Sequence, residues 1–102
     1  MSDQYVQNFE WDQTKATSNR RKHGISFEQA ATVFRDPLML SIADDDHSQT
    51  EQRWITMGQM KGGELLIVIH AHQQINHQTA TIRIISARLA TRHERRQYEN
   101  NT

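Results

Sequence analysis

Four strand-like segments follow one another in the second half of the chain, and this run constrains the fold more than any other feature. Leu65–Ile69 is apolar on both faces, which is typical of a central strand covered on both sides. Gly62-Gly63 predicts a tight hairpin before it, and the polar stretch His72–Thr79 predicts a longer exposed connection after it. Sequential strands joined by short turns favour an antiparallel sheet. The four segments are Leu38–Ala43, Gln52–Met57, Leu65–Ile69 and Thr81–Ser86.

The first part of the chain predicts one short strand followed by a helix. Asn8–Trp11 is predicted to be a strand, with Phe9 and Trp11 on one face. Asp12 is a favourable N-cap for a helix over about 13–22, and Gly24 supplies its C-terminal stop. Ala16 is the only apolar residue of this helix, so the helix has little packing of its own. One side of the helix carries Lys15, Asn19, Lys22 and His23. This polar side is either a binding face or simply a solvated helix surface.

Two capping boxes predict the other helices. Ser26 and Gln29 open a second helix, which Asp36-Pro37 ends because a residue before proline resists helical geometry. Thr91 and Glu94 open a terminal helix. The element order is therefore β-α-α-β-β-β-β-α, an α+β fold with two N-terminal helices and one C-terminal helix on an antiparallel sheet.

Length and composition fit one small domain. The chain has 102 residues, which is a common domain size, and we expect the domain to span residues 8–102 after a flexible extension over 1–7. Only 35% of the residues are hydrophobic, so the core must be small and part of the surface is expected to await a partner. No cysteine, secretory signal or apolar stretch of membrane-spanning length is present, and we expect a cytoplasmic protein.

The zero net charge conceals a segregation of charge. Residues 15–22 and 83–96 together hold nine of the twelve Lys and Arg residues but only one of the twelve Asp and Glu residues. These windows therefore carry a balance of +8, and the rest of the chain carries −8. Such segregation can build a positive face that attracts phosphate, although solvated Arg-rich helices give the same pattern.

A set of motifs between Phe9 and Tyr98 resembles the BrnT family. The motifs occur in order along nearly the whole chain. They are Phe9-Glu10-Trp11-Asp12, Lys15, Asn19, Lys22-His23-Gly24, Phe27, Asp36-Pro37-Leu38, Arg53–Gly58 (RWITMG), Arg83-Ile84-Ile85-Ser86-Ala87-Arg88, and Thr91-Arg92 with Glu94-Arg95.

The resemblance implies a type II toxin, a small ribonuclease with a RelE-like fold that arrests translation. It also implies a ribbon-helix-helix antitoxin similar to BrnA, which masks the toxin and lets the complex bind operator DNA. The alternative is a non-catalytic nucleic-acid-binding or interaction module on the same fold, which would keep the basic face and lose the proton-transfer groups.

Metal-independent RNA cleavage needs groups that move protons and groups that stabilise charge on the phosphate. His70 closes the central strand and is our first candidate for proton transfer, unless it contacts phosphate or fills the strand end. Arg88 and Arg53 are candidates for the phosphate, because the planar guanidinium matches phosphate oxygens. A salt bridge to the acidic stretch Asp44–Asp46 competes with this role for Arg53. Tyr98 completes the catalytic set, and packing in the core or an antitoxin contact is its alternative.

Four further cations are candidates for positioning RNA through its phosphates: Lys15, Lys22, Arg83 and Arg92. For Lys15 and Lys22 the competing interpretation is a solvated helix face. His70 and His72 could bind Zn²⁺ with His77, as in a metal sensor, but an HxH pair without further ligands is a weak signal. We therefore expect neither a metal nor another cofactor.

Overall fold

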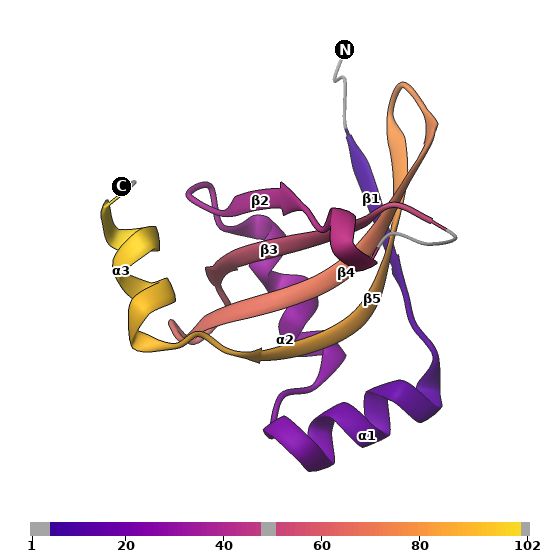
Figure 1. The fold of residues 1–102 in the computed structure, drawn as a ribbon. Helices are drawn as coiled ribbons and strands as arrows, with labels where there is room; N and C mark the ends of the chain where they lie inside the picture. The colour runs from indigo at the N-terminus through magenta and orange to yellow at the C-terminus, as the bar shows by residue number, and fades with distance from the viewer. Residues whose placement is uncertain (1–4, 48–50, 101–102) are drawn as a thin grey trace.

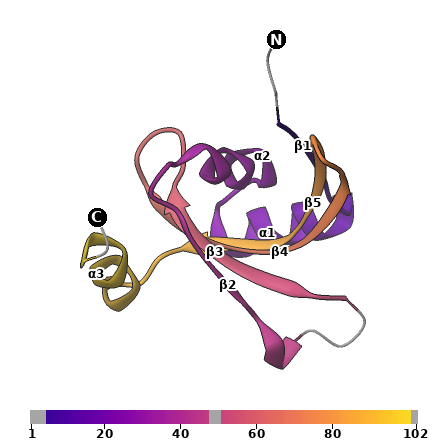
Figure 2. The ribbon, with the colours of Figure 1, turned by 90° about the horizontal axis from the view of Figure 1, so that it is seen from above.

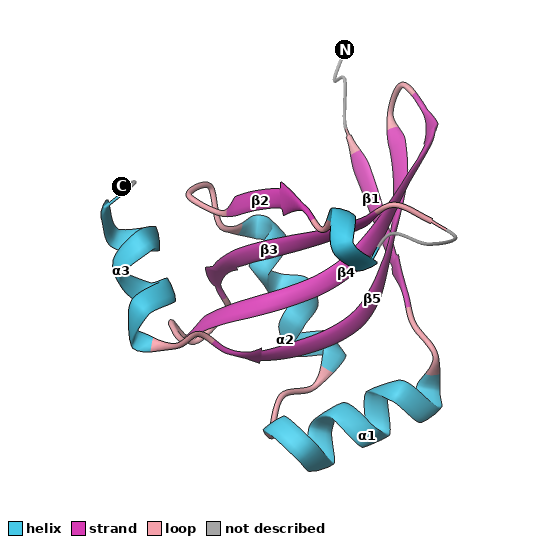
Figure 3. Cartoon of the chain, in the orientation of Figure 1, coloured by secondary structure: helices cyan, strands magenta, loops and turns pink. Residues whose placement is uncertain are grey.

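The computed structural model describes residues 5–47 and 51–100, which form a five-stranded sheet and three α-helices (Figures 1 and 3). Two short 3₁₀ helices, η1 and η2, complete the fold. The element order agrees with the one predicted from the sequence. In chain order the elements are β1 (Val6–Glu10), α1 (Gln13–His23), α2 (Phe27–Ala31), η1 (Thr32–Arg35), β2 (Leu40–Ala43), η2 (Asp45–His47), β3 (Arg53–Gln59), β4 (Leu65–Asn76), β5 (Thr79–Leu89) and α3 (Arg92–Asn100).

The sheet is mixed, and the prediction of a purely antiparallel sheet is wrong in this respect. Its strand order is β1-β5-β4-β3-β2, and β1 runs parallel to β5 while all other neighbours are antiparallel. The rule of sequential antiparallel pairing applies to strands joined by short turns. It says nothing about β1, because two helices and three other strands separate β1 from β5 in the sequence.

The hairpin of β4 and β5 is longer than predicted. His72–Thr79 is not a loop, because β4 continues to Asn76 and β5 begins at Thr79. The polar side chains of this segment are exposed while its backbone is paired, so composition alone suggested a loop. β1 also begins earlier than predicted, at Val6, so residues 6 and 7 of the expected extension lie in the sheet. Residues 1–4 lie outside the described residues.

The helix caps confirm the sequence signals. The Asp12 side chain accepts hydrogen bonds from the backbone N–H groups of Thr14 and Lys15, and Gly24 ends α1 with a φ of 74°. Both capping boxes form, at Ser26 with Gln29 and at Thr91 with Glu94. The second predicted helix is α2 continued by η1.

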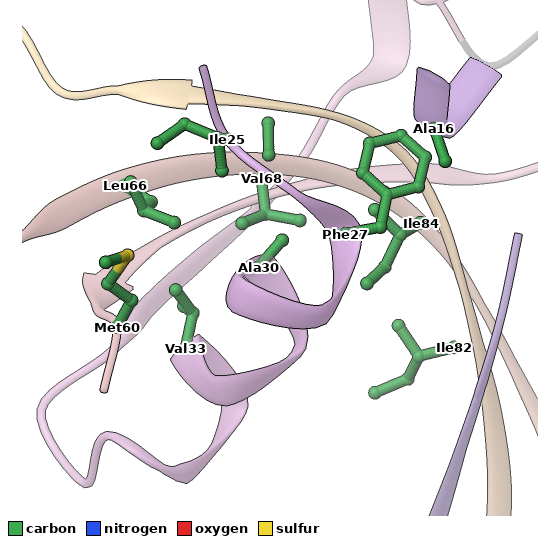
Figure 4. Close-up of a cluster of buried hydrophobic side chains, with 11 residues drawn as sticks. Ala16, Ile25, Phe27, Ala30, Val33, Met60, Leu66, Val68, Ile82 and Ile84 are labelled. Carbon is green, nitrogen blue, oxygen red and sulfur yellow. The ribbon is translucent and has the colours of Figure 1, made fainter. Parts of the chain in front are cut away.

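One face of the sheet holds the main core. Figure 2 shows α1 and α2 together on this side. Phe27, Ala30 and Val33 pack against Val68 and Ile84, and all five side chains are at most 1% exposed (Figure 4). A bulge between β4 and β5 opposite Ile69 and His70 changes the register.

Asn19 joins α1 to this core. Its side-chain amide donates to the carbonyl oxygens of Ile25 and Ala87, at 3.1 and 2.9 Å, and its side-chain oxygen accepts from the N–H of Ala87 at 3.1 Å. Asn19 is 6% exposed. It therefore satisfies backbone groups of β5 and of the loop after α1, which supports a structural interpretation of this motif residue.

The opposite face of the sheet is here called the open face, and α3 covers one end of it. Tyr98 of α3 packs there against Met57, Leu65 and Ile67. The strand register arranges the other side chains of this face in rows that cross the sheet, since directly paired residues share a face. Away from α3, Ile55 and Ile69 of this face are only partly buried and Ile42 is exposed, so the described residues leave part of the face accessible.

Candidate functional site

One row of the open face brings two arginines together. Arg53 on β3 and Arg83 on β5 both pair with Ala71 of β4, so the two arginines flank one small residue on the same face. Two strand spacings separate their Cα atoms, roughly 10 Å. Both guanidinium groups can therefore reach a single phosphate between them. The sequence could not show this arrangement, because Arg53 and Arg83 are 30 residues apart.

Carboxylates border the two arginines. Glu51, just before β3, forms an ion pair with Arg83, and both side chains are more than a third exposed. Glu10 of β1 lies opposite Arg83 in the parallel register. A pocket of about 240 Å³ opens at this place, lined by Glu10, Glu51, Gln52, Ala71, His72, Gln73, Thr81 and Arg83. We call Glu51, Arg53 and Arg83 the arginine–carboxylate cluster.

The cluster combines the two chemical roles that RNA cleavage without metal requires. Guanidinium groups stabilise charge on a phosphate, and a carboxylate can accept a proton from a hydroxyl. Sequence reasoning assigned Arg53 to catalysis and Arg83 to RNA positioning, and it missed Glu51 as a site residue. The available signal was the position of Glu51 two residues before Arg53, which puts a carboxylate close in sequence to a candidate arginine.

His70 lies on the opposite face of the sheet from this cluster. It is 4% exposed, and its Nε2 is 2.7 Å from the hydroxyl oxygen of Thr56, which is itself 2.7 Å from the Ser41 hydroxyl oxygen. The Phe34 ring meets the imidazole edge-on with ring centroids 4.8 Å apart. Burial lowers the pKa of His70 to about 4, so the side chain is neutral at pH 7. This setting favours a structural role.

Arg88 is held in a two-pronged ion pair. Both of its terminal nitrogens donate to the Glu94 carboxylate at 2.8 Å. The Glu94 hydrogen bonds raise the pKa of Arg88, and those from Arg88 lower the pKa of Glu94 to about 2. Because Glu94 also caps α3, this pair attaches α3 to the end of β5. Arg88 lies on the open face but four β4 residues away from the arginine row, opposite Ile67.

Tyr98 is buried and fixes the other side of α3. Its hydroxyl donates to Oδ2 of Asp36 at 2.5 Å, and burial together with this carboxylate raises the pKa of Tyr98 to about 12. Burial alone would raise the pKa of Asp36, but hydrogen bonds from the Gln59 N–H, the Tyr98 hydroxyl and the Leu38 N–H lower it. Tyr98 thus anchors α3 to the segment between η1 and β2.

The remaining predicted cations do not gather around Arg83. Lys15 and Lys22 are exposed on α1, on the helix-covered side of the sheet, and Arg92 is the first residue of α3. Among residues 5–47 and 51–100, no group of three or more His, Cys, Asp or Glu residues is arranged to hold a metal ion. Within the same ranges, no helix has the length and apolar character needed to cross a membrane.

Comparisons with known proteins identify relatives of this chain. A family model described as the ribonuclease toxin BrnT of type II toxin–antitoxin systems matches residues 11–94. The 1.1 Å crystal structure of the Brucella abortus ribonuclease toxin BrnT is similar in fold, with a TM-score of 0.58 and 19% sequence identity. The match covers 85% of this chain and 100% of the Brucella chain. A search of curated proteins finds no match.

Proposed function

The chain belongs to the BrnT family of ribonuclease toxins of type II toxin–antitoxin systems, and from this premise we propose that it is a metal-independent endoribonuclease that arrests translation in the cytoplasm. The same premise gives it a RelE-like architecture. Its antitoxin is then a ribbon-helix-helix protein similar to BrnA, and operator DNA is bound only through the complex of the two proteins.

The arginine–carboxylate cluster carries the proposed mechanism. Arg53 and Arg83 hold the scissile phosphate from two sides, since they flank Ala71 on one face of the sheet. The Glu51 carboxylate, which pairs with Arg83 in the free protein, takes the proton of the RNA 2′-hydroxyl. The 2′-oxygen then attacks the phosphorus, the bond to the 5′-oxygen breaks, and the leaving 5′-oxygen takes a proton from water while Glu51 returns its own proton to solvent. The guanidinium groups balance the negative charge that develops on the phosphate oxygens and the leaving oxygen.

Other predicted site residues receive supporting roles in this proposal. His70 stays neutral and packs the helix-covered face, while Arg88 and Tyr98 hold α3 in place. Lys15, Lys22 and Arg92 attract RNA through its phosphates at a distance from the reaction. Their loss should weaken RNA binding for every sequence and reduce its salt dependence.

Cleavage of a purified RNA by the purified protein tests the proposal. We expect Arg83→Ala to lower the rate by at least 100-fold, because removing one preformed donor to a charged transition state typically costs that much. Arg35→Ala, at an exposed residue of η1, is the matched control and should cleave at the wild-type rate. Cleavage should continue in the presence of a metal chelator.

Two results would contradict parts of this proposal. A folded wild-type protein that binds RNA without cleaving it would support the non-catalytic module. Full activity of Arg83→Ala together with an inactive His70→Gln variant of normal stability would move the reaction to the other face of the sheet.

A further inference from the structure

The row of arginines on the open face continues onto the edge strand β1. Glu10 pairs with Arg83 in the parallel register, so its side chain lies on the same face at the end of this row. The next row toward the tip of the β4–β5 hairpin holds three uncharged polar residues: Gln73, Thr81 and Asn8. The pocket of about 240 Å³ lies where the two rows meet, and Glu10, Gln73 and Thr81 are among its lining residues. The pocket therefore places further hydrogen-bonding side chains directly beside the arginines.

The Glu10 carboxylate is the member of this pocket that the proposed reaction does not use. Its side chain is exposed, and within residues 5–47 and 51–100 it makes no hydrogen bond or ion pair. Arg83, its neighbour in the row, is paired with Glu51 instead. A free carboxylate beside a phosphate site opposes RNA binding, because like charges repel. Its place in the pocket is accounted for by a ligand that offers hydrogen-bond donors to it.

The hydrogen-bonding capacity of Glu10 selects one RNA base. An ionised carboxylate only accepts hydrogen bonds, so a base bound at Glu10 must present donors. Guanine presents two neighbouring donors on its Watson–Crick edge, N1–H and the N2 amino group, and one carboxylate accepts both at once. Uracil presents a single donor on this edge, while adenine and cytosine present an amino group beside an acceptor nitrogen, which a carboxylate repels. The Gln73 amide and the Thr81 hydroxyl can donate to O6, the remaining acceptor on the guanine edge.

The spacing across the sheet suits a single nucleotide. Two strand spacings, roughly 10 Å, separate Ala71, over which the arginines would hold the phosphate, from Glu10. A nucleotide spans a comparable distance from its phosphorus to the Watson–Crick edge of its base. Glu51 lines the same pocket. The 2′-hydroxyl that Glu51 would deprotonate and the base at Glu10 therefore belong to the same nucleotide.

We propose that Glu10 recognises guanine in the nucleotide that carries the attacking 2′-hydroxyl, with Gln73 and Thr81 completing the base pocket. This inference rests on the proposed function, from which RNA cleavage follows. The protein then cuts RNA after guanosine. It requires single-stranded RNA at this position, because a paired guanine does not present its Watson–Crick edge.

The test compares cleavage of three RNA strands that differ in one base. Each strand is 2′-O-methylated at every position but one, so cleavage can follow only the single ribonucleotide, which is guanosine, inosine or adenosine. The wild type should cleave the guanosine strand with a kcat/KM roughly tenfold or more above that of the adenosine strand, as a bidentate contact to a base discriminates by about this factor. Inosine lacks the N2 amino group of guanosine, and its strand should fall between the other two.

Glu10→Gln tests the residue itself, because it keeps the size of the side chain and replaces one accepting oxygen by a donor. This variant should lose the preference for guanosine over inosine and adenosine. Loss of a charge alone changes the rates of all three strands alike, so the ratio of rates isolates recognition of the base. Glu64→Gln, at an exposed residue just before β4, is the matched control and should keep the wild-type ratios.

The possible failures of this inference and of the proposed function differ. Equal cleavage of the guanosine and adenosine strands by the wild type, or an unchanged preference in Glu10→Gln, would overturn the inference and leave the ribonuclease intact. A wild type that cleaves none of the strands would refute the ribonuclease itself. Binding of fully 2′-O-methylated strands, measured by fluorescence anisotropy, then decides about the pocket. A guanosine preference that Glu10→Gln loses would retain the pocket, and equal binding of all strands would overturn it.

Discussion

The buried histidine makes protein stability depend on pH in a way that one substitution should remove. His70 has a pKa of about 4 in the folded protein, against an ordinary value of 6.5. At pH values between about 4 and 6.5, His70 binds a proton in the unfolded chain but not in the folded protein. Stability is therefore fully present above pH 6.5 and declines as the pH falls toward 4. From these two pKa values, the loss attributable to His70 at pH 4.5 is about 2–3 kcal/mol.

Urea unfolding followed by tryptophan fluorescence measures this effect between pH 4.5 and 7.5. His70→Gln removes the titrating group but keeps a polar side chain near Thr56. The substitution changes stability by an amount that does not depend on pH, so the difference in unfolding free energy between the wild type and the variant should shrink by about 2–3 kcal/mol from pH 7.5 to 4.5. His72→Gln, two residues along β4 and exposed, controls for the other histidines and should keep the wild-type dependence. Parallel curves for wild type and His70→Gln would refute the assignment of a neutral, desolvated imidazole.

Three further substitutions test the packing and anchoring contacts. Glu94→Ala should release α3 and speed tryptic cleavage within that helix. The control Glu28→Ala, at an exposed residue of α2, should be cleaved at the wild-type rate, and an equal cleavage rate for Glu94→Ala would contradict the anchoring role of the Arg88–Glu94 pair. Gly58→Ala should cost about 1–3 kcal/mol in urea unfolding, because the new methyl would lie 2.9 Å from Val33 Cγ1, and Val33→Ala in the same chain should restore part of the loss. Asn19→Ala should cost about 2–3 kcal/mol by leaving buried groups of Ala87 unpaired, against no change for the exposed Ser18→Ala.

Local signals predicted the elements well, because each depends on residues within one turn. Asp12, Gly24 and the two capping boxes satisfy backbone groups two to four residues away, and all of them form as predicted. The β4–β5 hairpin extended further than its composition suggested. Exposed glutamine and asparagine are poor strand formers alone, but backbone pairing with the neighbouring strand overrides that preference.

The candidate site was harder to predict because it depends on register. A shift of one residue moves a side chain to the other face of a strand. His70 and Ala71 are neighbours in sequence, yet one lies in the core beneath Phe34 and the other lies between Arg53 and Arg83. The sequence supplied the arginines as candidates, but only the pairing of β3, β4 and β5 shows that Arg53 and Arg83 lie in the same row of one face.

The parallel pairing of β1 with β5 has a consequence for the order in which the protein forms. β1 is the first strand to be synthesised, and its neighbour in the sheet is the last. During synthesis β1 has no sheet partner until β5 has emerged, 69 or more residues later, at Thr79. Closing so long a segment is slow compared with forming a hairpin. Glu10 lies on that first strand, opposite Arg83, so the border of the arginine–carboxylate cluster is completed only when the chain is nearly finished.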